Sequence, residues 1–212
     1  FSMAGFTTGH RTLYRGLHSL LSGEMVLFHG GEAARRRWHI YRPWLAEAVE
    51  RPAALRQLKS VTLGLFEKLR DSLAGRPVLV PLSAGLDSRL VVSALHHLGY
   101  RNVTCLSYGQ PGNHEMAVAR PVAERLGYRF VYVPSTLGKL RAYFAGEQHR
   151  RYMEFADTFQ SVPTEQDHPI IAELMSGGAL SAETVVINGQ SGDYITGGHV
   201  ARSLMATLEA RD

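Results

Sequence analysis

The chain has 212 residues, of which 45% are hydrophobic, and a formal net charge of +4 at pH 7. Its apolar content is that of an ordinary globular protein with a sizeable core. The single cysteine, Cys105, excludes an internal disulfide framework and a Cys-rich metal site. No run of about 18 or more apolar residues predicts a membrane span, and no signal peptide is evident, so we expect a soluble, cytoplasmic protein with no membrane partner.

The positive charge is concentrated in only two dense basic runs, at residues 35–37 and 149–151. Neither run has the interleaved aromatic residues that stack nucleic-acid bases. Such runs are typical of a solvated surface, so we expect no nucleic-acid partner. The chain opens with Phe1 rather than Met and ends at Asp212 inside a helical pattern, so we expect it to be part of a longer protein.

The first 45 residues predict short antiparallel strands and then a linker. Short apolar stretches such as residues 25–28 alternate with polar ones, and turn signals stand at residues 22–23 and 30–31. A segment of this kind could hardly bury a core by itself. We therefore expect it to be the end of a larger β-rich domain, with a linker at residues 42–44.

From Pro52 the sequence takes on the period of an amphipathic helix. Pro52 suits the first helical turn, and Gly75 followed by Pro77 suits the end. The apolar positions recur at spacings of three and four: Leu55, Leu58, Val61, Leu65, Leu69 and Leu73.

Beyond this helix, apolar runs alternate with helical patterns. The predicted strands are residues 78–82, 103–108, 129–133 and 184–188; helices are expected at 88–97 and 114–126, and a charge-rich helical stretch precedes the last strand. This alternation predicts an α/β fold with a parallel sheet, flanking helices and right-handed crossovers. Pro121 inside the second helical pattern predicts either a kinked helix or a later start.

The segment after the first of these strands reads Ser83-Ala84-Gly85-Leu86-Asp87-Ser88. Small residues let an anion approach the backbone, while hydroxyls and free N–H groups at a helix N-terminus donate hydrogen bonds to it. The segment therefore predicts a phosphate site. The structural alternative is an ordinary strand–turn–helix in which Asp87 is the N-cap.

Polar or aromatic residues follow three of the predicted strands. They are Ser83, Tyr108 and Asn188. Ligands of open parallel sheets bind beyond the carboxyl ends of the strands. We therefore expect these three residues to lie at one edge of one sheet.

Segment 83–88 resembles the pyrophosphate loop (PP-loop) of ATP pyrophosphatases, usually Ser-Gly-Gly-x-Asp-Ser, and it is not a Walker loop. Two further motifs resemble the synthetase domain of the asparagine synthetase family. Residues 107–128 are similar to its second strand, loop and helix, and residues 188–199 are similar to its second signature. Upstream, residues 12–17 and 22–24 resemble the last strands of the glutaminase domain that precedes it. The motifs occur in the same order as in the glutamine-hydrolysing asparagine synthetase family.

The resemblance implies an adenine nucleotide alpha hydrolase-like fold of the PP-loop type. It implies that residues 1–45 are the remnant of an N-terminal-nucleophile glutaminase domain with its linker. Residues 46–212 would be an ATP-binding synthetase domain, incomplete at its C-terminus, so we expect this chain alone to be inactive.

The implied activity is that of an ATP-dependent carbon–nitrogen ligase. A substrate carboxylate, of aspartate or a related acid, would attack ATP and release pyrophosphate, and glutamine-derived ammonia would then form the amide. The implied cofactors are ATP and Mg²⁺, with a homodimer as the implied assembly. Asp87 and Asp193 would hold the metal, because hard oxygen ligands with phosphate favour Mg²⁺.

The family's pattern maps onto this chain residue by residue. Asp87, Gln190 and Asp193 fall at its catalytic positions, and Arg89 and His199 are further candidates for substrate contact. The implied nucleotide contacts are Leu82, Ser83, Ala84, Gly85, Leu86 and Ser88 in the loop, Leu106, Ser107 and Tyr108 on the adenine and ribose side, and Asn188 and Gly189 facing them.

The chain departs from the family's pattern in a few places. Ala84 replaces the middle loop glycine, and Gln190 stands where the family has Glu. The catalytic lysine expected downstream is not in the sequence, and Cys105, in an apolar strand, is interpreted as a structural thiol rather than a glutaminase nucleophile. Two alternatives stay open: a catalytically inactive nucleotide-binding homologue and a tRNA-modifying PP-loop enzyme.

Overall fold

The computed structural model describes residues 5–40, 50–190 and 192. The chain divides into two compact units. One comprises Phe1–Ala54 and Tyr143–Gln166, and the other comprises Leu55–Ala142 and Asp167–Asp212. The second unit contains the parallel sheet and is described first.

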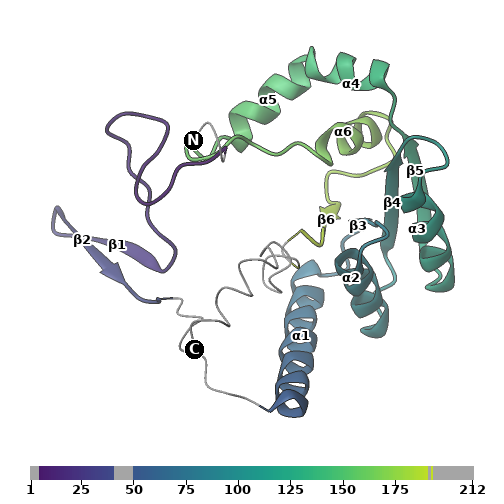
Figure 1. Ribbon diagram of the computed structural model, residues 1–212, viewed down its shortest axis with the longest axis horizontal. Helices are drawn as coiled ribbons and strands as arrows, with labels where there is room; N and C mark the ends of the chain where they lie inside the picture. The colour runs from purple at the N-terminus through teal and green to yellow at the C-terminus, as the bar shows by residue number, and fades with distance from the viewer. Residues whose placement is uncertain (1–4, 41–49, 191, 193–212) are drawn as a thin grey trace, which may run out of the picture. The chain divides into compact units, whose positions relative to one another are not determined.

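Four parallel strands form the sheet of this unit: β3 (Val78–Pro81), β4 (Val103–Gly109), β5 (Arg129–Pro134) and β6 (Val185–Val186). Their order is β5-β4-β3-β6, so β3 lies inside the sheet (Figure 1). The predicted parallel sheet is confirmed. Only β6 is markedly shorter than expected, because its ladder with β3 covers two residue pairs.

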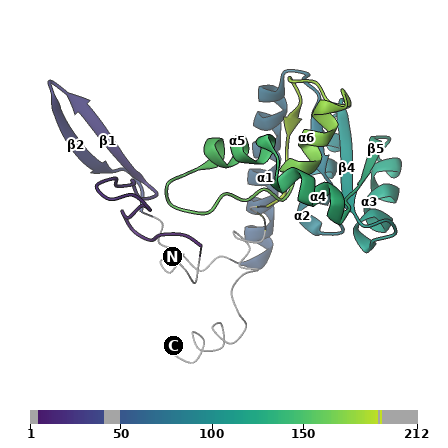
Figure 2. The same ribbon diagram turned by 90° about the horizontal axis from the view of Figure 1, so that it is seen from above.

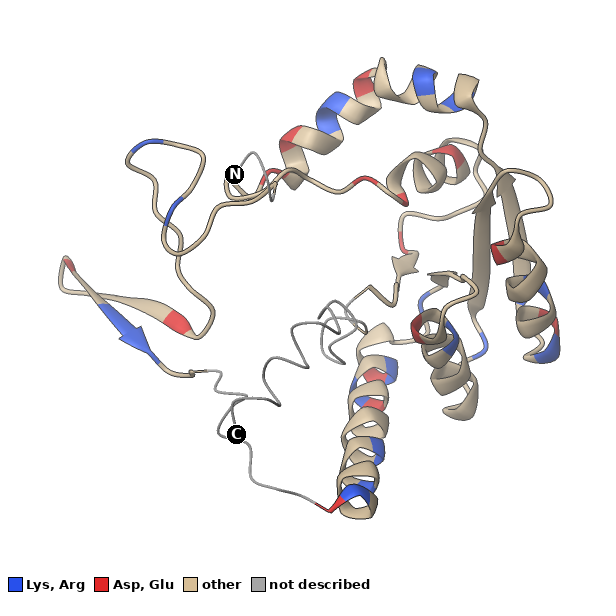
Figure 3. Ribbon diagram, in the orientation of Figure 1, with Lys and Arg blue, Asp and Glu red and all other residues tan. Residues whose placement is uncertain are grey.

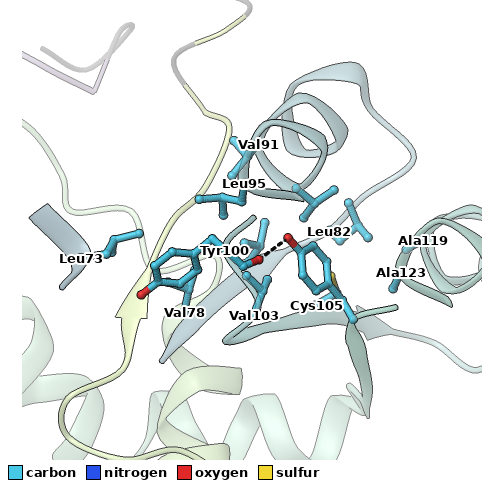
Figure 4. Packing of buried hydrophobic residues seen from close by; sticks show 13 residues of the cluster. Leu73, Val78, Leu82, Val91, Leu95, Tyr100, Val103, Cys105, Ala119 and Ala123 are labelled. Atoms are coloured by element: carbon cyan, nitrogen blue, oxygen red, sulfur yellow. Dashed lines mark hydrogen bonds between the residues drawn. The ribbon is translucent and has the colours of Figure 1, made fainter. Parts of the chain in front are cut away.

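One face of the sheet packs against three helices. Val78 and Val80 of β3 alternate toward this face, as the two-residue period of a strand requires. They meet the end of α1 (Arg51–Leu73), the inner side of α2 (Leu86–His97) and two alanines of α3 (His114–Arg125), as Figure 4 shows. In the same cluster the Tyr128 hydroxyl donates a hydrogen bond to the Tyr100 carbonyl oxygen at 2.8 Å.

The opposite face carries a second, smaller core. Leu79, Leu106 and Val133, from three neighbouring strands, pack with Ile170 of α6 (His168–Ser176). Figure 2 shows α6 beside β4 on this side. Helices thus cover both faces, which explains why β3 and β4 are apolar and carry no charged residue (Figure 3).

Helix α1 has the predicted bounds and the predicted period, but most of its apolar stripe is not buried. Leu55, Leu58 and Leu65 are 55%, 62% and 62% exposed, whereas Leu73 at the C-terminal end is 1% exposed. Charged residues also lie along the helix in Figure 3. Only its last turns therefore contribute to the described core. The helix ends where Gly75 adopts a φ of +80°, a conformation that favours glycine.

Helix α3 runs through Pro121 and begins at His114. Of the two expectations for Pro121, the one that the helix begins later in the sequence is therefore wrong. The position loses one intrahelical hydrogen bond, because proline has no N–H. Asn113 stabilises the start of the helix, since its Oδ1 accepts the Met116 N–H at 2.8 Å.

The other unit contains a β-hairpin. Strands β1 (Glu24–His29) and β2 (Glu32–Arg37) pair antiparallel, which confirms antiparallel strands in this part of the sequence. Arg37 donates to Glu24 across the hairpin at 3.0 Å. The Tyr14 hydroxyl donates to Asp157 just after α5 (Glu147–Ala156) at 3.1 Å, so the N-terminal segment and the region after α5 belong together. The glutaminase-domain origin of this segment stays a prediction.

The remaining helix, α4 (Leu137–Phe144), follows β5, and the sequence boundary between the two units falls within it. Within the described ranges, no helix is both long and apolar enough to cross a bilayer.

Candidate nucleotide-binding site

The order of the strands places a topological switch point beside β3. From β3 the chain proceeds outward to β4 and β5, then crosses back to form β6 on the other side of β3. Strands β4 and β6 therefore lie on opposite sides of β3. Open α/β sheets bind ligands in the crevice that this creates at the carboxyl ends of the strands. The segments after β3, β4 and β6 meet at this edge, as the sequence predicts.

The loop after β3 is held together by its own two serine hydroxyls. Ser88 Oγ accepts the Ser83 N–H at 3.1 Å and lies 3.0 Å from Ser83 Oγ. Ser83 Oγ in turn accepts the Gly85 N–H at 3.1 Å. Ser88 is 6% exposed, so its hydroxyl fixes the shape of the loop. The sequence analysis assigns both hydroxyls to phosphate, whereas this conformation uses them inside the loop.

Helix α2 begins at Leu86, two residues earlier than expected. Its N-cap is Gly85, with an extended backbone and no side-chain cap hydrogen bond. Asp87 lies inside the first turn, so the alternative that makes Asp87 the N-cap is wrong. Ala84 does not adopt a positive φ, which agrees with its replacing the usual glycine.

The Asp87 side chain lies against the segment that follows β6. A Cβ atom added to Gly192 would fall 2.1 Å from Asp87 Oδ1, and one added to Gly189 would fall 2.8 Å from Asp87 Cβ. Both positions therefore require glycine for this close approach. Within the described ranges, the Asp87 carboxylate has no hydrogen bond or ion pair.

The loop after β4 also reaches the segment after β3. Glu115, in the first turn of α3, accepts the Ala84 N–H at its Oε2 over 2.7 Å. Sequence analysis assigns no role to Glu115. Glu115 could have been identified as an acidic residue in the first turn of a helix that begins at the edge of the sheet where the ligand is expected.

The residues expected on the adenine side differ in their exposure. Leu106 and Ser107 are buried, with 0% and 3% exposed surface. The Tyr108 hydroxyl donates to Asp167 Oδ1 at 2.6 Å, so this ring is tied to the N-cap of α6. Asn188 is exposed after β6, and its Oδ1 accepts the Gln190 N–H at 3.4 Å.

Three other residues that are expected to contact the nucleotide or the substrate are described by the structure. Leu82 is 2% exposed in the core, whereas Leu86 is 75% exposed at the start of α2. Arg89 donates from Nε to the Gly85 carbonyl oxygen at 3.0 Å, so its cation stands beside the loop. Asp193 and His199 lie outside the described residues.

Cys105 has the environment of a structural thiol. It is fully buried in β4, and this burial raises the pKa of the thiol to about 12. A thiol with so high a pKa is protonated at neutral pH and is a poor nucleophile.

The sequence model of the asparagine synthase family matches residues 67–211, which is more than half of the chain. The chain belongs to the asparagine synthase family. This is a family of ATP-dependent amide-forming ligases, whose members use ATP, usually with Mg²⁺. The matched region includes the loop after β3, Glu115 and the segment after β6.

Among solved structures, the chain is similar to an NH₃-dependent NAD synthetase from Campylobacter jejuni in complex with the nitrate ion. The two are 16% identical with a TM-score of 0.44, and the match covers 67% of this chain. The chain spans 59% of the length of that synthetase. A TM-score below 0.5 does not establish a common fold, so the family rests on the sequence match. No curated protein matches the chain significantly.

Proposed function

We propose that this chain forms the ATP-binding part of an enzyme that activates a carboxylate as its adenylate and converts it to an amide. The observation that carries the proposal is the position of Asp87. Its carboxylate lies at the switch point of the sheet, between the loop after β3 and the glycines after β6. This is the position at which an open parallel sheet binds its ligand.

The start of α2 supports the binding of a pyrophosphate group there. The first N–H groups of a helix have no intrahelical acceptor, and the helix dipole is positive at this end. Leu86 and Asp87 belong to this first turn; the preceding Gly85 has no side chain, and that of Ala84 is a single methyl group. The β- and γ-phosphates of ATP are the anions that we assign to this position.

The donor set also fits Mg²⁺. A carboxylate cannot by itself favour a phosphate, because like charges repel, but it can share a magnesium ion with one. Asp87 has an unpaired carboxylate within the described ranges, and glycines at 189 and 192 keep side chains away from it. Asp87 would hold the ion, together with Asp193 as proposed from the sequence. The ion would offset the negative charge that the phosphates develop.

The chemistry assigned to the bound ATP follows from the poor reactivity of a free carboxylate. The substrate carboxylate attacks the α-phosphorus, the bond to the bridging oxygen breaks, and pyrophosphate leaves. Ammonia derived from glutamine then attacks the acyl carbon, and AMP leaves with the bonding electrons. The protein's own task is to align these groups, which lowers the entropic part of the barrier. Aspartate or a related acid is the proposed substrate.

ATP–pyrophosphate exchange tests the proposal. The full-length protein that contains this chain is incubated with ATP, Mg²⁺, labelled pyrophosphate and one candidate carboxylic acid at a time. We expect label to enter ATP only when the correct acid is present. Absence of exchange with every acid, together with retained ATP binding, would instead favour a nucleotide-binding homologue without catalysis.

A further inference from the structure

A charged side chain faces the loop after β3, and what we infer from it rests on the proposed function of that loop. Of the three consecutive N–H groups at residues 83–85, two donate to serine hydroxyls within the loop and α2. The third, of Ala84, donates to a group from another element, the carboxylate of Glu115. The acceptor of the outward-directed N–H is thus itself an anion.

The position of Glu115 is fixed by the loop that precedes it. Asn113 Nδ2 donates to the Tyr108 carbonyl oxygen at 3.1 Å, while its Oδ1 caps α3. Gly109 has a φ of +122°, and a Cβ there would fall 2.5 Å from Asn113 Nδ2. These contacts set the start of α3, and with it the place from which the Glu115 side chain reaches Ala84.

A carboxylate and a phosphate oxygen cannot both accept the same N–H at full strength, because their negative charges repel. A bound anion must therefore displace Glu115 or lose this donor. Hydrogen bonds that involve a charged group are stronger than neutral ones, so the displacement costs binding energy. The cost is moderated by solvent, because Glu115 is exposed.

We propose that Glu115 is an internal competitor for the loop that lowers its affinity for free anions, and so determines which phosphates it retains. Simple anions such as inorganic phosphate offer few contacts to offset the displacement. The pyrophosphate group of a nucleotide has more oxygens, and the rest of the nucleotide makes further contacts, so that together they can offset the cost of displacing Glu115. Glu115 is therefore a specificity-determining residue of this site.

The test measures the binding of metal-free inorganic pyrophosphate and of inorganic phosphate by calorimetry, in buffer containing a chelator. The proteins compared are the wild type, Glu115→Gln and Glu115→Ala. Glu124→Gln is the matched control, because it removes the same charge from an exposed position of the same helix. Melting temperatures verify that all four proteins are folded.

We expect Glu115→Gln to bind both anions about fivefold or more tightly than the wild type, and Glu115→Ala at least as tightly as Glu115→Gln. Glu124→Gln should bind them as the wild type does. Unchanged or weaker anion binding in both Glu115 variants overturns the inference while leaving the proposed function intact. Absence of pyrophosphate binding by all four proteins also overturns the inference, whereas the proposed function is tested separately by the Mg²⁺-dependent exchange.

Discussion

Gly192 lies so close to Asp87 that a Cβ on the glycine would fall 2.1 Å from the aspartate Oδ1. The two residues are far apart in sequence, and each stands in a different motif at the same edge of the sheet. No non-bonded carbon can occupy that position. This close contact explains why a glycine stands at position 192 after β6, since a side chain there would clash with the Asp87 carboxylate.

Gly192→Ala is therefore expected to displace Asp87 or the segment after β6, and to weaken the binding of Mg²⁺–ATP. Gly64→Ala is the control, because a Cβ at this interior position of α1 meets nothing within 4 Å. This control should raise the stability by about 0.5–1 kcal/mol, the usual difference between glycine and alanine in a helix. Calorimetry with Mg²⁺–ATP checks the first effect and urea unfolding the second. Unchanged ATP affinity in Gly192→Ala would show that the close approach has no role in binding.

Asp87→Asn should leave the fold intact and abolish most of the chemistry. Asp87 is not a cap, so the change removes only a favourable charge from the first turn of α2, at a cost within about 1 kcal/mol. If this charge holds Mg²⁺ as proposed, its loss should lower ATP–pyrophosphate exchange by about 100-fold or more. Melting temperature and exchange rate are measured on the same samples.

Asp71→Asn is the matched control for this variant, because Asp71 is an exposed carboxylate of α1 paired only with Arg70 within the described ranges. It should keep full exchange activity. If Asp87→Asn also keeps full activity, the metal role of Asp87 has no support.

Ser88→Ala should destabilise the protein, because the Ser83 N–H loses its acceptor in a nearly buried position. Leaving such a group unsatisfied costs about 1–3 kcal/mol. Ser93→Ala, on the exposed side of the same helix, should change the free energy of unfolding little. Urea titrations of the two variants give the comparison. Equal stabilities would contradict the internal role of the Ser88 hydroxyl.

The Cys105 thiol should not react with a soluble thiol reagent until the protein is unfolded. Burial raises its pKa from an ordinary value near 9 to about 12. Because the folded-state pKa is the higher one, the corresponding stability is complete below pH 9 and is lost as pH rises toward 12. Melting temperature should therefore fall more steeply across this range in the wild type than in Cys105→Ala. Both proteins contain the same tyrosines, so the difference in slope reports the thiol. Parallel slopes, or rapid labelling of the folded protein, would contradict the burial argument.

The sequence predicts the strands and helices of the sheet unit well, because apolar runs and helical periods alternate clearly there. Residues 78–82 and 103–108 differ from β3 and β4 by a single residue. The strand order is not readable from such patterns, although the common edge is. The sequence does not predict that the apolar stripe of α1 is exposed, since a helical period indicates an apolar face without showing what covers it.

For the candidate site, too, the sequence predicts some features and not others. The motifs identify which loops meet, but the partners of single side chains depend on contacts between distant residues. The hydrogen bond from Tyr108 to Asp167 joins residues 59 positions apart, and that from Ala84 to Glu115 joins residues 31 apart. The alternative that makes Asp87 the cap of α2 rests on aspartate being a common cap residue, whereas in the structure Gly85 supplies the extended backbone.

We propose that the loop after β3 positions ATP for attack at its α-phosphate, and product analysis tests this role most directly. The full-length protein that contains this chain is incubated with Mg²⁺, ammonia, a candidate carboxylic acid and ATP labelled in the α- and γ-positions, and the products are separated by chromatography. We expect AMP and pyrophosphate in equal amounts, formed only with the acid and lost in Asp87→Asn. Formation of ADP and inorganic phosphate would contradict it.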